Sequence, residues 1–375
     1  MAKKKSRNIA VKALKVAGTL LSLALAAAVV TSAYAGMADP MEWNYLPMAG
    51  LAFPVVLGAA AALLVVWLLL RQFRMAAILA LALAVSCGPI LTFSPINIGG
   101  ATSDDDKPQS FSLLTYNALN FWDFTTGEKA PTPNRTLEFI LQTDADIVCV
   151  QEMPTELCLE KWEREYAKSI TERLCERYPY HSNKRQGLMT FSKYPIKATN
   201  DSVYSANDIV YVGHDISIQG YTLRVYNCHM QSLSLTDTDK AIFSDLTQIA
   251  SHNEQDLAQV HDLLTTKLLT AFRSRSLQAK KLREKIDTCS VDNVIVCGDF
   301  NDTPGSFAYR TILGDDMSDA YRDRALGPTI TFHSNHLYFR IDHVLYRGAM
   351  RAVDIDRPDI DCSDHYPLLA TLAWD

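Results

Sequence analysis

Six short polar motifs, each next to an apolar run, carry the residue types that could do chemistry in this chain. They read Thr115-Tyr116-Asn117, Gln151-Glu152, Asn227-Cys228-His229, Gly298-Asp299-Phe300-Asn301, Arg340-Ile341-Asp342-His343 and Ser363-Asp364-His365. Carboxylate and amide oxygens bind hard divalent cations, and a histidine beside a carboxylate can transfer protons. Gathered at the ends of several strands, such residues could support metal-assisted attack of water on a phosphate ester.

Each motif taken alone has an ordinary structural explanation. Asn117 could cap a turn, Glu152 could mark the exit of a strand into solvent, and His229 could be a hydrogen-bonded histidine without a catalytic role. Asp299 and Asn301 are two residues apart, so an extended backbone would place both side chains on one face. The joint occurrence of all six motifs in one order is what favours a catalytic site.

Apolar runs of strand length alternate with helical segments beyond residue 110. Strands are expected at Phe111–Tyr116, Ile147–Val150, Leu188–Phe191, Ile209–Ile218, Leu223–Tyr226, Val294–Cys297 and Ile341–Tyr346. Helices are expected at Asn134–Gln142, Glu156–Arg177, Asp256–Ile286 and Ser306–Leu313. Strands that are apolar almost throughout indicate a sheet covered on both faces, so the sequence predicts a layered α/β domain. Polar residues just past the strand ends can converge on a shared crevice.

The first hundred residues differ in kind from the rest. Val16–Val30, Met48–Leu70 and Met75–Phe93 contain no charged residue, and each is close to the roughly 20 residues that cross a bilayer as a helix. Lys and Arg precede the first run and lie between the second and third, whereas Ala35–Leu46 has neither. The positive-inside rule therefore predicts three transmembrane helices with the C-terminal domain on the non-cytoplasmic side, periplasmic or external.

The N-terminus has other possible interpretations. A cleaved signal peptide fits the basic start and Ala33-Tyr34-Ala35, and it would leave two spans with the same final orientation. Buried helices of a soluble protein are disfavoured because three apolar runs follow one another closely. A transporter is disfavoured because the spans contain no acidic residue. The expected organisation is an anchor over residues 1–93, a solvated linker over 94–110 and a catalytic domain over 111–375.

Charge and motif content narrow the function classes. Beyond residue 108 the chain holds 27 Lys and Arg against 37 Asp and Glu, a formal charge of about −10, which weakens a duplex-binding interpretation. A basic cluster at 273–285 is either a ligand-facing surface or a solvated helix, and the second is favoured. Glycine-rich phosphate loops, the G-x-S-x-G elbow and zinc-ligand spacing do not occur.

The cysteines predict no disulfide framework. Cys149, Cys228 and Cys297 lie inside apolar strand-like runs and are interpreted as small buried residues. Cys158 and Cys175 flank a helical stretch and could pair, although their spacing alone does not favour it.

In type and order, the six motifs resemble the endonuclease/exonuclease/phosphatase superfamily, whose fold is DNase I-like. The segment Gly187–Ile196 resembles a further family segment, and the apolar N-terminus is similar to that of bacterial membrane-anchored members. This resemblance implies a four-layer α/β sandwich, with two sheets packed face to face and helices outside. It also implies a phosphoesterase that depends on Mg²⁺ or Mn²⁺.

The same resemblance implies a metal site. Glu152 would be the principal carboxylate ligand, and Asn117 and Asp364 would lie close to the ion or its waters. Hard oxygen ligands of this kind suit Mg²⁺, which usually keeps several waters.

It also implies roles for five catalytic residues. Asp299 would orient or deprotonate the attacking water, and Asn301 would hydrogen-bond the scissile phosphate. His229 would donate to a non-bridging oxygen, while His365, paired with Asp342, would act on the phosphate or assist proton transfer. A carboxylate beside a histidine favours imidazolium. The carboxylate that supports His229 is not assigned from the sequence.

The substrate is left open between two chemistries. Tethering beside a bilayer and the absence of a basic groove in the sequence favour a phospholipid or small phosphate ester, with external nucleic acid as the competitor. The expected partners are the phosphate-ester substrate and the lipid bilayer. A noncatalytic membrane receptor or scaffold that retains the fold is the alternative function, and the intact polar groups of all six motifs argue against it.

Overall fold

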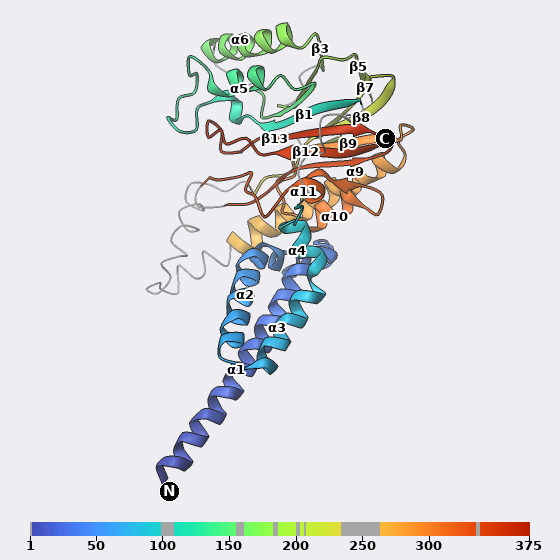
Figure 1. Ribbon diagram of the computed structural model, residues 1–375. Coiled ribbons are helices and arrows are strands. Elements are labelled where there is room, and N and C mark those ends of the chain that lie inside the picture. The colour runs from blue at the N-terminus through green and yellow to red at the C-terminus, as the bar shows by residue number, and fades with distance from the viewer. Residues whose placement is uncertain are drawn as a thin grey trace. The chain divides into compact units, whose positions relative to one another are not determined.

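The computed structural model shows a helical N-terminal unit and an α/β C-terminal unit (Figure 1). The residues it describes are 2–98, 109–154, 161–182, 187–199, 203–205, 208–233, 263–334 and 338–375.

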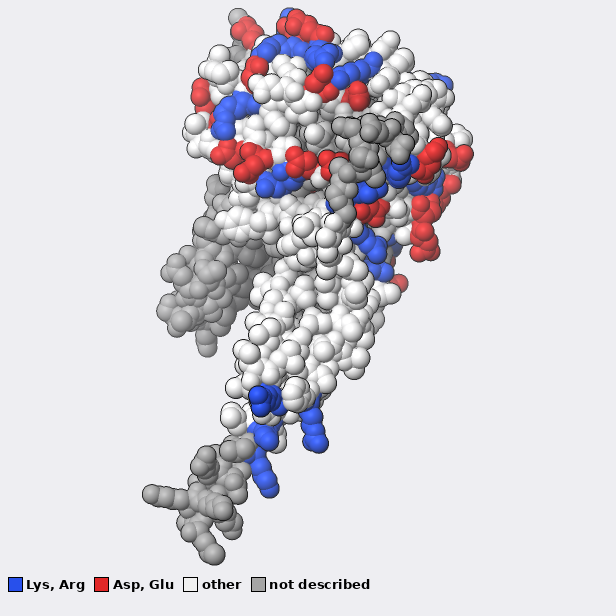
Figure 2. Space-filling model, in the orientation of Figure 1, with Lys and Arg blue, Asp and Glu red and all other residues white. Residues whose placement is uncertain are grey.

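The N-terminal unit is built from apolar helices. Its elements are α1 (Ala2–Tyr34), η1 (Ala35–Met37), η2 (Pro47–Ala52), α2 (Phe53–Leu69), α3 (Phe73–Val85) and α4 (Cys87–Phe93). Val29, Ala60 and Leu79 are buried where α1, α2 and α3 pack together. The sides of these helices carry uncharged residues, and basic side chains gather at one end of the unit (Figure 2).

Two of these segments are long and apolar enough to cross a membrane, Lys12–Met37 and Pro47–Leu69. The third expected span is present as two helices, α3 and α4, which meet at a bend of 66° and count as one span only if taken together. The expectation of three spans therefore becomes two or three.

One sheet of the α/β unit has six strands in the order β12-β13-β1-β2-β4-β3. Their bounds are β1 (Ser110–Asn117), β2 (Ile147–Gln151), β3 (Tyr180–His181), β4 (Met189–Ser192), β12 (Met350–Asp356) and β13 (Leu368–Trp374). Only the β1–β2 pairing is parallel.

The second sheet has the order β10-β11-β9-β8-β7-β5, and β6 pairs with β7 to make seven strands. Their bounds are β5 (Ile196–Ala198), β6 (Val203–Ser205), β7 (Asp208–Ile218), β8 (Tyr221–His229), β9 (Asn293–Asp299), β10 (Ser318–Asp319) and β11 (Asp342–Arg347). Here only β8 and β9 are parallel.

Side-chain alternation along the strands builds the layers. Leu113 of β1 and Cys149 of β2 point into the core between the sheets, where they meet residues such as Val225 of β8. Their neighbours Leu114 and Val148 point to the opposite face. Because successive residues of a strand face opposite sides, apolar strands bury both faces of each sheet.

Helices cover the two outer faces. The six-stranded sheet packs against α5 (Arg135–Thr143) and α6 (Lys161–Arg177). The seven-stranded sheet packs against α9 (Leu269–Asp287) and α10 (Phe307–Leu313). This order of helices, sheet, sheet and helices is the expected four-layer α/β sandwich.

The expected elements are found with small shifts at their ends. Asn134 is the N-cap of α5, its side chain accepting a hydrogen bond from the backbone N of Leu137 at 2.7 Å, so the helix proper begins one residue later than expected. The expected helices at 156–177 and 256–286 begin in residues outside the described ranges. Within the described ranges, α6 begins at Lys161 and α9 begins at Leu269. β12 and β13 were not anticipated.

The cysteines behave as expected where they are described. Cys149, Cys228 and Cys297 are fully buried and free, and burial raises the pKa of the Cys228 and Cys297 thiols. These thiols are therefore protonated core residues. Cys158, the potential partner of Cys175, lies outside the described residues.

Candidate active site

Strand ends from both sheets bring the polar motifs to one end of the sandwich. Asn117 ends β1, His229 ends β8 and Asp299 ends β9. His229 lies opposite Asp299 in the parallel β8–β9 pair, and Asp342, the first residue of β11, lies opposite Asp299 on its other side. The backbone register alone therefore places these side chains around Asp299.

A close approach of two backbones explains the glycine before Asp299. Gly298 has φ of +127°, and a Cβ at this position would lie 2.1 Å from the carbonyl oxygen of Cys228 on the neighbouring strand. Any other residue would push β8 and β9 apart where they present His229 and Asp299.

Asn117 joins carboxylates from the two sheets. Its Nδ2 donates to Oε1 of Glu152 at 3.0 Å and to Oδ2 of Asp299 at 3.1 Å. The hydroxyl of Ser363 donates to the carbonyl oxygen of Asn117 at 2.7 Å, which ties the C-terminal motif to the same strand end. Glu152 directly follows β2 and has φ of +52°, a left-handed conformation that turns the chain away from the sheet.

His229 lies between two carboxylates. Its Nε2 is 3.7 Å from Oε1 of Glu152 and 3.7 Å from Oδ2 of Asp299. Both separations are longer than a hydrogen bond, and both carboxylates also accept from Asn117.

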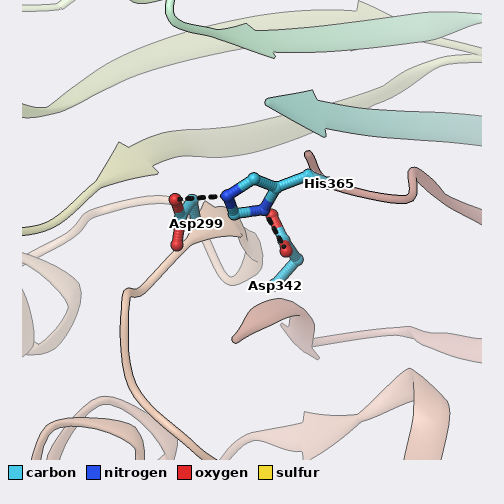
Figure 3. A group of neighbouring side chains, drawn as sticks. All are labelled: Asp299, Asp342 and His365. Atoms are coloured by element: carbon cyan, nitrogen blue, oxygen red, sulfur yellow. Dashed lines mark hydrogen bonds and ion pairs between the residues drawn. The ribbon is translucent and has the colours of Figure 1, made fainter. Parts of the chain in front are cut away.

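His365 is held by two buried aspartates (Figure 3). Its Nδ1 is 2.9 Å from Oδ2 of Asp342, a hydrogen bond, and its Nε2 is 3.6 Å from Oδ2 of Asp299. Both aspartate side chains are almost fully buried. The ring can therefore donate from both nitrogens when it is protonated.

The electrostatics favour an imidazolium at His365. Burial by itself would lower the pKa of this histidine, but the charges of Asp342 and Asp299 outweigh it and raise the pKa to about 10. Burial also raises the pKa of Asp299, assisted by Asp342 and opposed by His365 and His229.

Asn301 is fixed by its own loop. Its backbone N donates to Oδ1 of Asp299 at 2.7 Å, and its Nδ2 donates to the carbonyl oxygen of Met230 at 2.9 Å and to Oδ2 of Asp299 at 3.2 Å. Asn301 also has a left-handed backbone, with φ of +51°. These contacts set the orientation of Asp299 as well as that of Asn301.

Asp364 belongs to the site through electrostatics. The pKa of its carboxyl is raised by burial and by the nearby charges of Glu152 and Asp299, and His365 opposes the shift. Its carbonyl oxygen accepts from the backbone N of His333 at 3.0 Å. All eight residues expected from the sequence are therefore brought together, seven by contacts and Asp364 by its charge interactions.

A divalent cation fits this donor set. The charges of Glu152 and Asp299 act on Asp364, and burial is the largest cause of the raised pKa values of Asp299 and Asp364. A bound cation favours the ionised form of carboxylates, and carboxylate oxygens suit Mg²⁺ and Mn²⁺. A second group, Asp299, Asp342 and His365, has ligand-type atoms within 4.8 Å of one another.

Two further residues of the motifs, Gln151 and Asn227, join the sheets beneath the site. Gln151 Nε2 donates to Oδ1 of Asn227 at 2.7 Å, and Asn227 Nδ2 donates to the carbonyl oxygens of Val150 and Met189 at 3.2 and 3.0 Å. Both side chains are buried. Gln151 directly precedes Glu152, and Asn227 lies two residues before His229. This closeness to predicted site residues is the sequence signal that could have identified them.

A buried ion pair supports the loop after β9. Arg275 Nε lies 3.1 Å from Oδ2 of Asp302, and both side chains are about 2% exposed. Arg275 Nη1 also donates to the carbonyl oxygen of Gln231 at 3.0 Å, and His343 Nε2 lies 3.0 Å from the carbonyl oxygen of Asp302. Arg275 thus connects α9 to the segments that follow His229 and Asn301.

This finding refines the interpretation of the basic cluster at 273–285. Arg275 is buried, and Arg283 pairs with Asp287 and Asp316. The favoured interpretation of a solvated helix holds for Lys280 and Lys281, which are exposed, but not for Arg275 or for the largely covered Arg283. The sequence gives no signal for the buried role of Arg275 beyond its membership of the cluster.

A comparison with protein-family models decides the assignment. Residues 114–365 match the model described as the Endonuclease/Exonuclease/phosphatase family. The chain belongs to this family. Family members include nucleases and phosphatases that hydrolyse phosphate esters, generally with a divalent metal. Residues 14–93 match a second model, described as a domain of unknown function (DUF8431).

Several solved structures are similar to this chain at low sequence identity. An endonuclease/exonuclease/phosphatase from Beutenbergia cavernae is 16% identical, with 71% of this chain and 72% of that chain covered and a TM-score of 0.49. Sphingomyelinase C from Streptomyces griseocarneus is 17% identical, with 70% and 99% covered and a TM-score of 0.40. TDP2 from C. elegans is 17% identical, with 72% and 77% covered and a TM-score of 0.45. A search of curated proteins gave no match.

Proposed function

We propose that this protein is a membrane-anchored, divalent-metal-dependent phosphoesterase that hydrolyses its substrate by attack of water. The observation that carries the proposal is the convergence on one oxygen, Oδ2 of Asp299. It is 3.1 Å from Nδ2 of Asn117, 3.7 Å from Nε2 of His229 and 3.6 Å from Nε2 of His365. A carboxylate flanked by a positioning amide and two histidines can hold a water and accept its proton.

The two histidines divide the remaining work. His365 is kept as an imidazolium by Asp342 and Asp299, so it can donate a hydrogen bond to a phosphate oxygen whose negative charge increases during the reaction. His229 is about one quarter exposed and can donate to a second non-bridging oxygen. Asn301 fixes the loop that orients Asp299, and to hydrogen-bond the phosphate its Nδ2 would have to leave one of its two present acceptors, Met230 or Asp299.

Glu152, Asn117 and Asp364 are the proposed holders of Mg²⁺ or Mn²⁺. When bound, such an ion polarises a phosphoryl oxygen and lowers the pKa of a water. The Asp299, Asp342 and His365 group is assigned instead to proton handling, because Nδ1 of His365 is already hydrogen-bonded to Asp342 at 2.9 Å. A protonated ring nitrogen has no lone pair for a metal.

A lipid or other small phosphate ester is the proposed substrate class. On the visible face of the α/β unit, acidic and basic side chains are interspersed (Figure 2), and the formal charge beyond residue 108 is about −10. Neither feature supplies the basic stripe with which proteins usually hold a long duplex. The proposed location of this unit is the non-cytoplasmic side, from the positions of Lys and Arg around the apolar segments.

The test is Mg²⁺-dependent hydrolysis by the full chain, purified in detergent, on one substrate panel. The panel contains a phospholipid, an inositol phosphate, a generic phosphodiester, RNA and duplex DNA, each assayed beside Asp299→Asn. Cleavage of a lipid or small ester that is lost in the variant supports the proposal. Preferential cleavage of nucleic acid would replace the substrate class, and a folded protein without activity on any of them would contradict hydrolysis.

A further inference from the structure

The chain enters the α/β unit almost immediately after its last apolar helix. Helix α4 ends at Phe93, and the carbonyl oxygen of Pro95 already accepts a hydrogen bond from the backbone N of Gly327 at 2.8 Å. Ile96 then pairs with Leu326 in an isolated antiparallel bridge. The beginning of the expected linker is therefore attached to the α/β unit, while residues 99–108 lie outside the described ranges.

Alternation along this segment separates an inner side from an outer side. The side chain of Asn97 points inward and donates to the carbonyl oxygens of Arg322 and Ala325 at 2.9 and 2.8 Å. In an extended segment the flanking residues Ile96 and Ile98 must then point outward. Residues directly opposite in an antiparallel pair have neighbouring side chains, so Leu326 lies beside Ile96.

These three side chains form an exposed aliphatic patch, defined here as Ile96, Ile98 and Leu326. Their exposed fractions are 63%, 86% and 69%, the highest of any large hydrophobic residue in the described part of the α/β unit. Removing exposed aliphatic side chains from water is favourable, so the patch favours an apolar environment.

Covalent distance indicates which environment the patch meets. Ile96 is three residues from the end of α4 and Ile98 is five, so at 3.3–3.6 Å per residue they lie within about 11 and 18 Å of it. The headgroup region on each side of a bilayer is several Å thick, and interfacial groups bury about 5–10 Å into its boundary with the acyl chains. A helix end at the membrane surface therefore holds the patch within reach of the lipid interface.

Charge beside the patch suits the same surface. Arg322, whose carbonyl oxygen holds Asn97, is exposed. Cationic side chains near a bilayer are attracted to anionic lipid headgroups.

We propose that the aliphatic patch of Ile96, Ile98 and Leu326 inserts into the interface of the bilayer that holds the N-terminal helices. It is a second membrane attachment, formed by the α/β unit itself. The inference rests on the anchoring part of the proposed function and is independent of catalysis.

The patch is joined to the active site through one loop. After Leu326 the chain reaches Thr331, whose Oγ1 accepts hydrogen bonds from the backbone N of Asp342 at 3.0 Å. The ring of Phe332 lies 5.1 Å from that of His365. Insertion of the patch would therefore fix the loop that contacts the backbone of Asp342 and the ring of His365, and would present the site to phosphate esters at the bilayer surface.

The test places a tryptophan in the patch of the full chain. Leu326→Trp is reconstituted in vesicles of phosphatidylcholine and phosphatidylglycerol, with and without lipids brominated on the upper acyl chain, and its emission is compared with that of the parent protein. Leu277→Trp is the matched control, since Leu277 is 47% exposed on α9. The expected result is loss of the added emission at position 326 in brominated vesicles, with no loss at position 277.

Two outcomes overturn the inference. Unquenched emission at position 326 with the wavelength of a water-exposed tryptophan shows that the patch does not enter the interface. Blue-shifted but unquenched emission at 326 shows that another protein surface, from this chain or a second copy, covers the patch. Ile98→Trp repeats the measurement if Leu326→Trp does not fold. Alkaline carbonate extraction of the same vesicles tests the anchor separately. Release of the protein from the vesicles would contradict the membrane anchor itself, and with it the proposed function on which the patch rests.

Discussion

Asp342 accepts a hydrogen bond from Nδ1 of His365 across 2.9 Å, and both side chains are buried at the end of the seven-stranded sheet. The carboxylate opposes the effect of burial and, with Asp299, raises the pKa of His365 from 6.5 to about 10. This pair keeps the ring charged throughout the neutral and mildly alkaline range.

Asp342→Asn should therefore change the pH dependence of hydrolysis. An amide cannot stabilise the imidazolium by charge, so we expect the alkaline limb of the pH–rate profile to move down by about one unit or more. Initial rates between pH 6 and 11 measure the shift, with circular dichroism as the folding control. An unmoved alkaline limb would contradict the role of Asp342.

The same pKa shift predicts a pH dependence of stability in the metal-free protein. The folded state favours the charged ring, so the stabilisation from His365 is fully present below pH 6.5 and is lost as the pH rises through about 10. Urea unfolding with EDTA present should show this loss in the parent chain and a smaller one in Asp342→Asn. The prediction is contradicted if the contribution of His365 to the unfolding free energy of the parent chain rises with pH.

The dependence of activity on metal concentration should distinguish Glu152, a proposed metal ligand, from Asp342, which is proposed to hold His365. Glu152→Gln removes the proposed principal ligand, so we expect the Mg²⁺ concentration for half-maximal activity to rise by about tenfold or more. Asp342→Asn should lower the maximal rate without raising that concentration. Titrations with Mg²⁺ and Mn²⁺ make the comparison, and an equal rise in both variants would make Asp342 a ligand.

The sequence predicted those strands and helices whose own residues already indicate that they are buried. Val148 and Val150 lie in a run that is apolar throughout, and such a run indicates a central strand whatever its neighbours are. β12 was missed because its outward residues Arg351, Asp354 and Asp356 resemble a solvated loop, and only its pairing with β13 makes it a strand.

The sequence predicts which residues belong to the site, but it does not predict which of them contact one another. The motifs identified His229, yet its position between Glu152 and Asp299 depends on strands from two sheets. Arg275 was grouped with exposed cations because charge in a sequence does not reveal burial. Its partner Asp302 is 27 residues away, and the packing of α9 brings the two together.

The acid–base assignments predict a large loss of rate without unfolding. Asp299→Asn and His365→Ala should each reduce the maximal rate by about 10²–10⁴-fold, since each removes a positioned proton-transfer group or donor. Asp316→Asn is the matched control, because Asp316 is an exposed carboxylate paired with Arg283 and Arg347. Near-full activity in either site variant would remove its assigned role, and a loss in the control would point to a general effect of surface charge.

The buried pair of Arg275 and Asp302 predicts non-additive stability. Arg275→Met leaves the Asp302 carboxylate buried without its partner, and breaking such a pair costs about 3–5 kcal/mol. The double variant Arg275→Met with Asp302→Asn removes both charges, so it should be less destabilised than Arg275→Met alone. Urea unfolding of the four proteins of this cycle, in the same detergent, measures the coupling.

The activity of the same variants tests whether the pair positions the site. Arg275 contacts the carbonyl oxygen of Gln231 as well as Asp302, so its loss should loosen both loops that frame Asp299 and Asn301. We expect a lower kcat in Arg275→Met under conditions where it is fully folded, with KM changed little. Arg275→Lys should recover part of it, because the charge remains although the forked geometry is lost. A folded Arg275→Met with normal kcat would restrict this pair to stability.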